Sequence, residues 1–67
     1  DLLDWNALPG LPIETRLSRL TWWVLTLSQQ GRTYGLRLPG HELPLDSGLD
    51  HRDECLRVLA LFGRERS

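Results

Sequence analysis

Residues 13–30, IETRLSRLTWWVLTLSQQ, carry the clearest pattern in this sequence. Apolar residues recur there at alternating spacings of four and three, the repeat of one helical face. They are Ile13, Leu17, Leu20, Val24 and Leu27. Pro12 suits the first turn, where its missing N–H is not needed, and Gly31 suits the end. We therefore expect one helix of roughly 27 Å, against which the rest of the chain packs.

Three short strands are predicted around this helix. The first covers residues 2–5, and the second covers residues 33–38, where apolar side chains alternate with Gly35 and Arg37. A turn at Pro39-Gly40 leads into a third, over residues 42–45. Because Pro44 cannot donate a ladder hydrogen bond, we expect this third strand at an edge.

A second helix is predicted over residues 51–62. Asp50 is a suitable N-cap, and Gly63 is expected to end the helix. Residues 64–67 then form a frayed, disordered tail. The expected inner face consists of Cys55, Leu56, Leu59 and Ala60.

The order of these elements, β-α-β-β-α, predicts a small α/β fragment. A strand, a crossover helix and a parallel strand make a right-handed unit, so the long helix packs on a two- to three-stranded sheet. We expect the first strand to be central, with one side lacking a neighbour. Trp22 lies opposite the apolar stripe, whereas Trp23 flanks it and is more easily buried. Residues 1–67 therefore read as a single small domain or as an excised part of a larger one.

Composition excludes several classes of function. The chain has 67 residues, eight basic and nine acidic, and a formal net charge of −1, which argues against a general polyanion binder. Its single cysteine excludes an internal disulfide. No apolar run approaches the ~20 residues of a membrane span. No nucleophile elbow or phosphate-binding glycine motif is present, so we expect no enzyme activity.

Three runs in this order resemble a known bacterial family: DWNALPGLPIETRLSRLTWWVL at 4–25, YGLRLPGHELPLDSG at 34–48 and HRDECLRVLALFG at 51–63. They are similar to the C-terminal part of domain-of-unknown-function family fifty-eight, a part that resembles a von Willebrand factor A domain, which has a Rossmann-type fold. The resemblance implies a structural or protein-interaction module that works with a MoxR-type AAA+ ATPase. It also implies a cytoplasmic location, in a parent protein anchored in the inner membrane.

The resemblance also raises the question of a metal site. In von Willebrand A domains the first strand ends in Asp-x-Ser-x-Ser, whose oxygens bind a divalent cation. The matching positions here are Asp4, Asn6 and Leu8; the first two could offer oxygens and the third offers none. Because Mg²⁺ needs several oxygen ligands, a degenerate adhesion-type site at Asp4 and Asn6 is an alternative, and no cofactor is expected.

A second group of metal-ligand types lies in the last third of the chain: His41, Asp46, Asp50, His51 and Cys55. His51 and Cys55 are four residues apart and can share a helix face. The group could serve metal or redox chemistry. The simpler expectation is that His51 faces solvent in the first turn and that Cys55 is a small core residue.

Trp22 is the candidate partner-binding residue, because an outward Trp is a favoured interface anchor. Alternatively it packs on another part of the parent domain or on the loop around Trp5. A homodimer through an unpaired strand edge also stays open. A small DNA-binding helical module is a further alternative, suggested by two helices and an all-arginine basic set. The interleaved acids weigh against it, so we expect a protein partner, no nucleic acid and no membrane contact.

Overall fold

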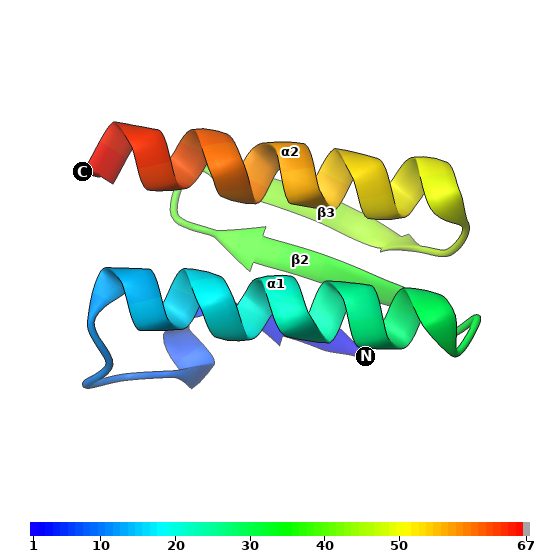
Figure 1. Ribbon diagram of the computed structural model, residues 1–67, viewed down its shortest axis with the longest axis horizontal. Helices are drawn as coiled ribbons and strands as arrows, with labels where there is room; N and C mark the ends of the chain where they lie inside the picture. Colours follow the sequence, from blue (N-terminus) through cyan, green and yellow to red (C-terminus); the bar gives the residue numbers. More distant parts are fainter. Residues whose placement is uncertain (67) are drawn as a thin grey trace.

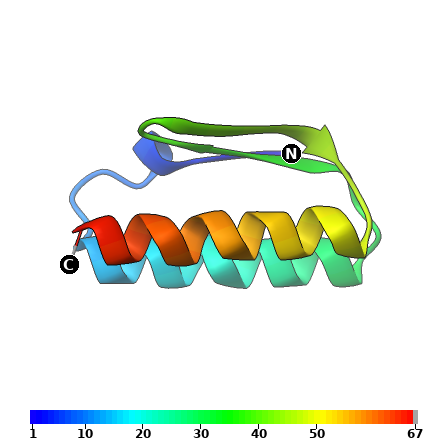
Figure 2. The ribbon, with the colours of Figure 1, turned by 90° about the horizontal axis from the view of Figure 1, so that it is seen from above.

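The computed structural model describes residues 1–66 and places two helices on one face of a three-stranded sheet (Figure 1). Seen from above, the two helices form one layer and the sheet forms the other (Figure 2). The helices run in opposite directions. The elements in chain order are β1 (Leu2–Asp4), the 3₁₀ turn η1 (Trp5–Ala7), α1 (Ile13–Gln29), β2 (Tyr34–Leu38), β3 (His41–Asp46) and α2 (Leu49–Arg66).

The sheet has the order β1-β2-β3, with β1 parallel and β3 antiparallel to β2. The expected parallel pair across α1 is therefore confirmed, as is the mixed α/β class. The expectation that the first strand would be central was wrong. The tight turn at Pro39 and Gly40 folds β3 directly back onto β2, so β2 is central and β1 lies at an edge. The first strand also ends at Asp4, because Trp5 enters η1.

One face of β2 points into the core. Tyr34, Leu36 and Leu38 are buried between the sheet and the helices. On the opposite face Gly35 lies where β3 departs from regular register. A Cβ there would lie 3.0 Å from the Leu43 carbonyl oxygen and 3.3 Å from a Leu45 methyl group. Glycine is therefore needed for the close approach of β3.

The helix predicted over residues 13–30 is confirmed as Ile13–Gln29. Its buried side chains are Leu20, Val24 and Leu27, as the spacing predicts, and Leu17 packs against this core from a half-buried position. Ile13, at the start of the stripe, is 43% exposed. Gly31 has a φ of 68°, the left-handed conformation that ends many helices.

The second helix is longer than predicted at both ends. It begins at Leu49, so Asp50 lies in its first turn and is not the N-cap. It also continues through Gly63 to Arg66, so residues 64–66 are helical and not a frayed tail; Ser67 lies outside the described residues. A Cβ at Gly63 would lie 3.0 Å from a Leu17 methyl group. Gly63 therefore lies at a close approach of the two helices and does not end α2.

The inner face of α2 also differs from the prediction. Cys55 and Leu59 are buried as expected, but Leu56 is half-buried and Ala60 is exposed. The other buried members of the face are His51, Val58 and Phe62. The spacing from 51 through 55, 58, 59 and 62 is itself helical. Helical periodicity alone is also consistent with a buried stripe through the neighbouring positions. Packing against the sheet decides which of the two stripes is buried.

Neither helix within residues 1–66 combines the length and the apolar character needed to cross a bilayer.

Candidate functional site

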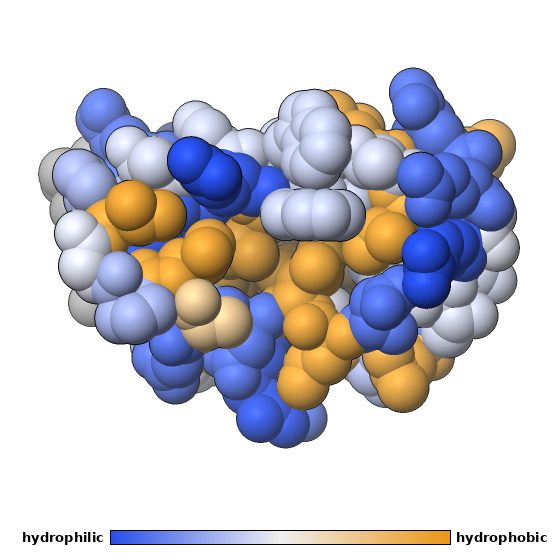
Figure 3. Space-filling model, turned by 90° about the horizontal axis from the view of Figure 1, so that it is seen from below, coloured by the Kyte–Doolittle hydropathy of each residue, from blue (hydrophilic) through white to orange (hydrophobic). Residues whose placement is uncertain are grey.

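The outer surface of α1 and α2, which faces away from the sheet, is hollowed between the two helices. Figure 3 shows the neighbouring flank of the molecule, on the side of α1 and β1, where weakly polar and apolar surface reaches solvent among hydrophilic side chains. The hollow has a volume of about 620 Å³. We call it the helix groove; its main lining residues are Leu17, Trp22, Leu25, Leu56, Ala60 and Gly63.

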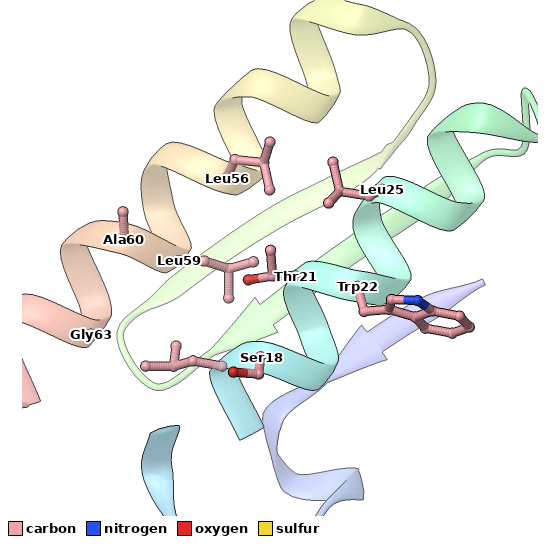
Figure 4. Close-up of a pocket in the computed structure, with 9 residues that line it drawn as sticks. Ser18, Thr21, Trp22, Leu25, Leu56, Leu59, Ala60 and Gly63 are labelled. Atoms are coloured by element: carbon pink, nitrogen blue, oxygen red, sulfur yellow. The ribbon is translucent and has the colours of Figure 1, made fainter. Parts of the chain in front are cut away.

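The groove is apolar, with small residues on both helices. Leu25 of α1 and Leu56 of α2 point toward each other across it (Figure 4). Ser18, Ala60 and Gly63 leave room for a third backbone to approach. The groove exists because α1 and α2 bury their inner stripes against the sheet and nothing in the described residues covers their outer side.

Trp22 forms the outer wall of this groove. Its side chain points away from α2 (Figure 4) and is 58% exposed, as the helical wheel predicts. Trp23 was expected to be easier to bury, and at 43% exposed it is more buried than Trp22, although it still reaches solvent. On the flank of α1, Trp23 lines a hollow together with Leu2 and Leu3 of β1. The two rings meet edge to face, with centroids 4.9 Å apart, so the ring partner of Trp22 is Trp23 and not Trp5.

A second hollow of about 430 Å³ lies on the other side of Trp22 and is lined by Trp22, Trp23 and Arg19, among others. No carboxylate within residues 1–66 forms an ion pair with Arg19. An exposed cation therefore lies directly beside two exposed indole rings. The sequence offers no signal for this arrangement, because ion pairing cannot be read from spacing.

Asp4 and Asn6, the weak metal candidates, make a local turn. The Asp4 carboxylate accepts a 3.0 Å hydrogen bond from the Asn6 backbone N–H and so caps η1. Its other oxygen lies 3.9 Å from Arg37 Nη1. Leu8 packs against the core. Both carboxylate oxygens thus already have partners within the chain.

His51 and Cys55 do share one helix face, but that face is buried. His51 is only 8% exposed, so the prediction of a solvent-side histidine was wrong. Its Nε2 lies 2.7 Å from the Tyr34 carbonyl oxygen and 3.7 Å from Cys55 Sγ. Cys55 is fully buried, as expected. Desolvation, with a smaller contribution from Glu54, raises the pKa of its thiol to about 11, so the thiol stays protonated at neutral pH.

The remaining candidates lie apart from this pair. His41 Nε2 is 3.9 Å from Glu65 Oε2, Asp46 accepts a hydrogen bond from the Ser47 N–H, and Asp50 is exposed at the start of α2. Among the described residues, no three His, Cys, Asp or Glu side chains lie close enough together to hold a metal ion.

One contact that sequence reasoning missed joins the two ends of the first loop. The Arg16 guanidinium carbon lies 5.0 Å from the Trp5 ring centroid, a cation–π geometry. Trp5 in turn contacts Phe62 edge to face, with centroids 4.8 Å apart. No spacing rule links Trp5 to Arg16 across a loop of irregular structure, so the sequence offered no signal for it.

No protein-family model, no curated protein and no solved structure matches this chain.

Proposed function

We propose that this chain is a non-catalytic protein-interaction module whose outer helix surface binds a helix of a partner protein. The observation that carries the proposal is Trp22, 58% exposed between two hollows. Large aromatic side chains beside apolar pockets dominate the energies of protein interfaces. The raised pKa of the Cys55 thiol fits a non-catalytic role, since the thiolate is the reactive form.

The partner segment is an amphipathic helix with small apolar side chains and an acidic residue at its margin. Helices pack by setting ridges into grooves, and the small residues Ser18, Ala60 and Gly63 allow a third helix to approach closely. Arg19 supplies an uncompensated positive charge beside Trp22 and Trp23. A carboxylate on the partner would complement it and favour one orientation.

The family resemblance extends this proposal to a parent protein. In that context the chain is a β-α-β-β-α piece of a von Willebrand A-like domain in a bacterial protein, located in the cytoplasm and anchored in the inner membrane. Its partner is a MoxR-type AAA+ ATPase. The parallel pairing of β1 and β2 across α1 supports the fold part of this proposal.

A binding titration with a purified MoxR-type ATPase from the same genome tests the proposal. Calorimetry should show binding by the native chain and at least a ~30-fold weaker Kd for Trp22→Glu, the loss typical of a hot-spot residue (about 2 kcal/mol). Arg19→Glu should weaken binding less, because its side chain is exposed. All variants should first give the native circular dichroism spectrum.

Leu45→Glu is the matched control. Leu45 is 60% exposed but lies on the sheet, away from the helix surface. Equal losses for Trp22→Glu and Leu45→Glu would mean that binding does not use the helix surface. No binding by the native chain would reject the ATPase as the partner and favour an intradomain role for this surface in the parent protein.

A further inference from the structure

A third hollow lies at the end of the molecule where β1 runs into η1 and where α1 begins. It has a volume of about 320 Å³ and is lined by Trp5, Leu11, Ile13, Arg16, Pro39 and Phe62. We call it the Arg16 pocket. It shares no lining residue with the helix groove or with the hollow at Arg19. In open α/β sheets, ligands bind outside the carboxyl ends of parallel strands, and the pocket lies at that end of β1.

Arg16 gives this pocket an uncompensated positive charge. Within the described part of the chain it forms no ion pair, and its buried Nε has no hydrogen-bond partner. The Trp5 ring holds the guanidinium in place through the contact at 5.0 Å. A partly buried cation without a counter-ion is costly, and an incoming anion would reduce that cost.

The first turn of α1 adds backbone donors at the same place. Its N-cap is Pro12, which has no side-chain acceptor, so no side chain caps the first N–H groups. Ile13 belongs to this turn and lines the pocket. The partial positive charge of the helix start also favours an anion. Glu14 is the opposing charge in this turn, but it is exposed and does not line the pocket.

The rest of the wall is apolar. Leu11, Pro39 and the aromatic pair Trp5–Phe62 surround the arginine. One guanidinium matches one planar carboxylate, which it can bind through two parallel hydrogen bonds. We propose that the Arg16 pocket binds a carboxylate carrying an aromatic or aliphatic group, either a small carboxylic acid or the C-terminal residue of a peptide.

Nuclear magnetic resonance of the full chain tests this site directly. The indole N–H signals can report on Trp5 separately from Trp22 and Trp23. Titration with 3-phenylpropionate should shift the signals of Trp5, Arg16 and the first turn of α1, with a Kd on the order of 1 mM. The neutral 3-phenylpropionamide should bind at least ~10-fold more weakly, because it lacks the charge that Arg16 recognises. An amide that binds equally well would overturn the proposal.

Substitutions of Arg16 test whether its guanidinium, and not the apolar wall of the pocket, accounts for carboxylate binding. Arg16→Gln should weaken binding of 3-phenylpropionate at least ~10-fold, whereas Arg19→Gln, on the same helix, should leave it unchanged. Because Arg16 also stacks on Trp5, Arg16→Lys keeps the charge and controls for misfolding; it should bind with intermediate affinity. Full affinity in a folded Arg16→Gln chain would reject the site.

A titration with peptides distinguishes the two possible ligands, a small carboxylic acid and the C-terminal residue of a peptide. Acetyl-Gly-Gly-Phe with a free carboxylate should shift the same signals, and its C-terminal amide should not. If the peptide acid binds at least as tightly as 3-phenylpropionate, the source is a protein C-terminus. If only the small acid binds, it is a free carboxylic acid. If neither acid shifts the Trp5 signal, the proposal fails.

Discussion

Three side chains beneath the sheet show how this small core accommodates polar groups. His51 lies between Tyr34 and Cys55, with its ring centroid 4.7 Å from that of Tyr34. Since a carbonyl oxygen can only accept, the 2.7 Å contact to the Tyr34 carbonyl assigns the hydrogen to His51 Nε2. The histidine thus donates to a strand carbonyl that lies beside the irregularity in the pairing with β3. Its role is structural.

The protonation of Cys55 predicts how stability depends on pH. Burial raises the pKa of its thiol from 9.0 to about 11, so between these values the folded state holds a proton that the unfolded state releases. The free energy of unfolding should therefore be unaffected by this group below pH 9 and fall as pH rises toward 11. The loss should be about 2 to 3 kcal/mol, measured by urea unfolding across this range.

Cys55→Ala is the control for this pH dependence. Its stability should be lower at pH 7, because a buried sulfur is lost, but should fall less steeply between pH 9 and 11. Burial also raises the pKa of Tyr34, and that contribution remains in both chains. If the free energy of unfolding falls equally steeply between pH 9 and 11 in both chains, the Cys55 thiol is not the cause of the pH dependence.

At this scale the sequence correctly predicted the exposure of Trp22, the burial of Cys55 and the greater burial of Trp23 than of Trp22. It placed His51 incorrectly, in solvent. Trp22 lies far from the apolar stripe, so its exposure follows from helix geometry alone. His51 lies at the end of its apolar stripe, where burial depends on how the helix packs against the sheet. The Arg16 contact with Trp5 depends on the path of a loop, which periodicity does not describe.

Among the elements, α2 shows how packing can override a local signal. Gly63 was expected to end the helix, but its φ is not positive, and α2 continues beyond it. Instead, Gly63 lies where α2 comes close to Leu17 of α1. Helix starts, strands and the α1 stripe could be placed within one or two residues because their patterns are local. The order of the strands could not, because it depends on which edge of β2 receives β3.

A substitution at Gly63 measures how tightly the helices pack. A Cβ there would lie 3.0 Å from Leu17 Cδ1, the end of a flexible side chain that can rotate away. Gly63→Ala should therefore stabilise the chain by up to about 1 kcal/mol through helix propensity. Ala60→Gly, at an exposed position of the same helix, should cost about 1 kcal/mol. Chemical unfolding followed by circular dichroism measures both. A loss above about 1 kcal/mol for Gly63→Ala would show that Leu17 cannot move.

For the whole molecule, the two-layer arrangement leaves the stabilising core and the proposed protein-binding surface on different sides of the helices. Chains of this length bury only about 60% of their unfolded surface, so the core between the layers must supply most of the stability. The outer helix surface lies outside it, whereas the Arg16 pocket lies at its edge, because the core residues Trp5 and Phe62 line that pocket. The sequence alone predicted the layers and Trp22 but not the hollows, because a hollow requires the relative placement of two helices.

This separation predicts that stability and surface apolarity can be changed independently. Trp22→Gln should alter the free energy of unfolding by less than about 0.5 kcal/mol, since the side chain is 58% exposed. Leu20→Ala, at a residue only 2% exposed, should cost about 2 to 5 kcal/mol. In a domain this small each kcal/mol shifts Tm by about 4 to 8 °C, so thermal unfolding resolves the two. Binding of a hydrophobic dye to the native state should fall for Trp22→Gln and not for a folded Leu20→Ala chain. A loss above about 1.5 kcal/mol for Trp22→Gln would place the indole ring in the folding core and remove it from the free surface.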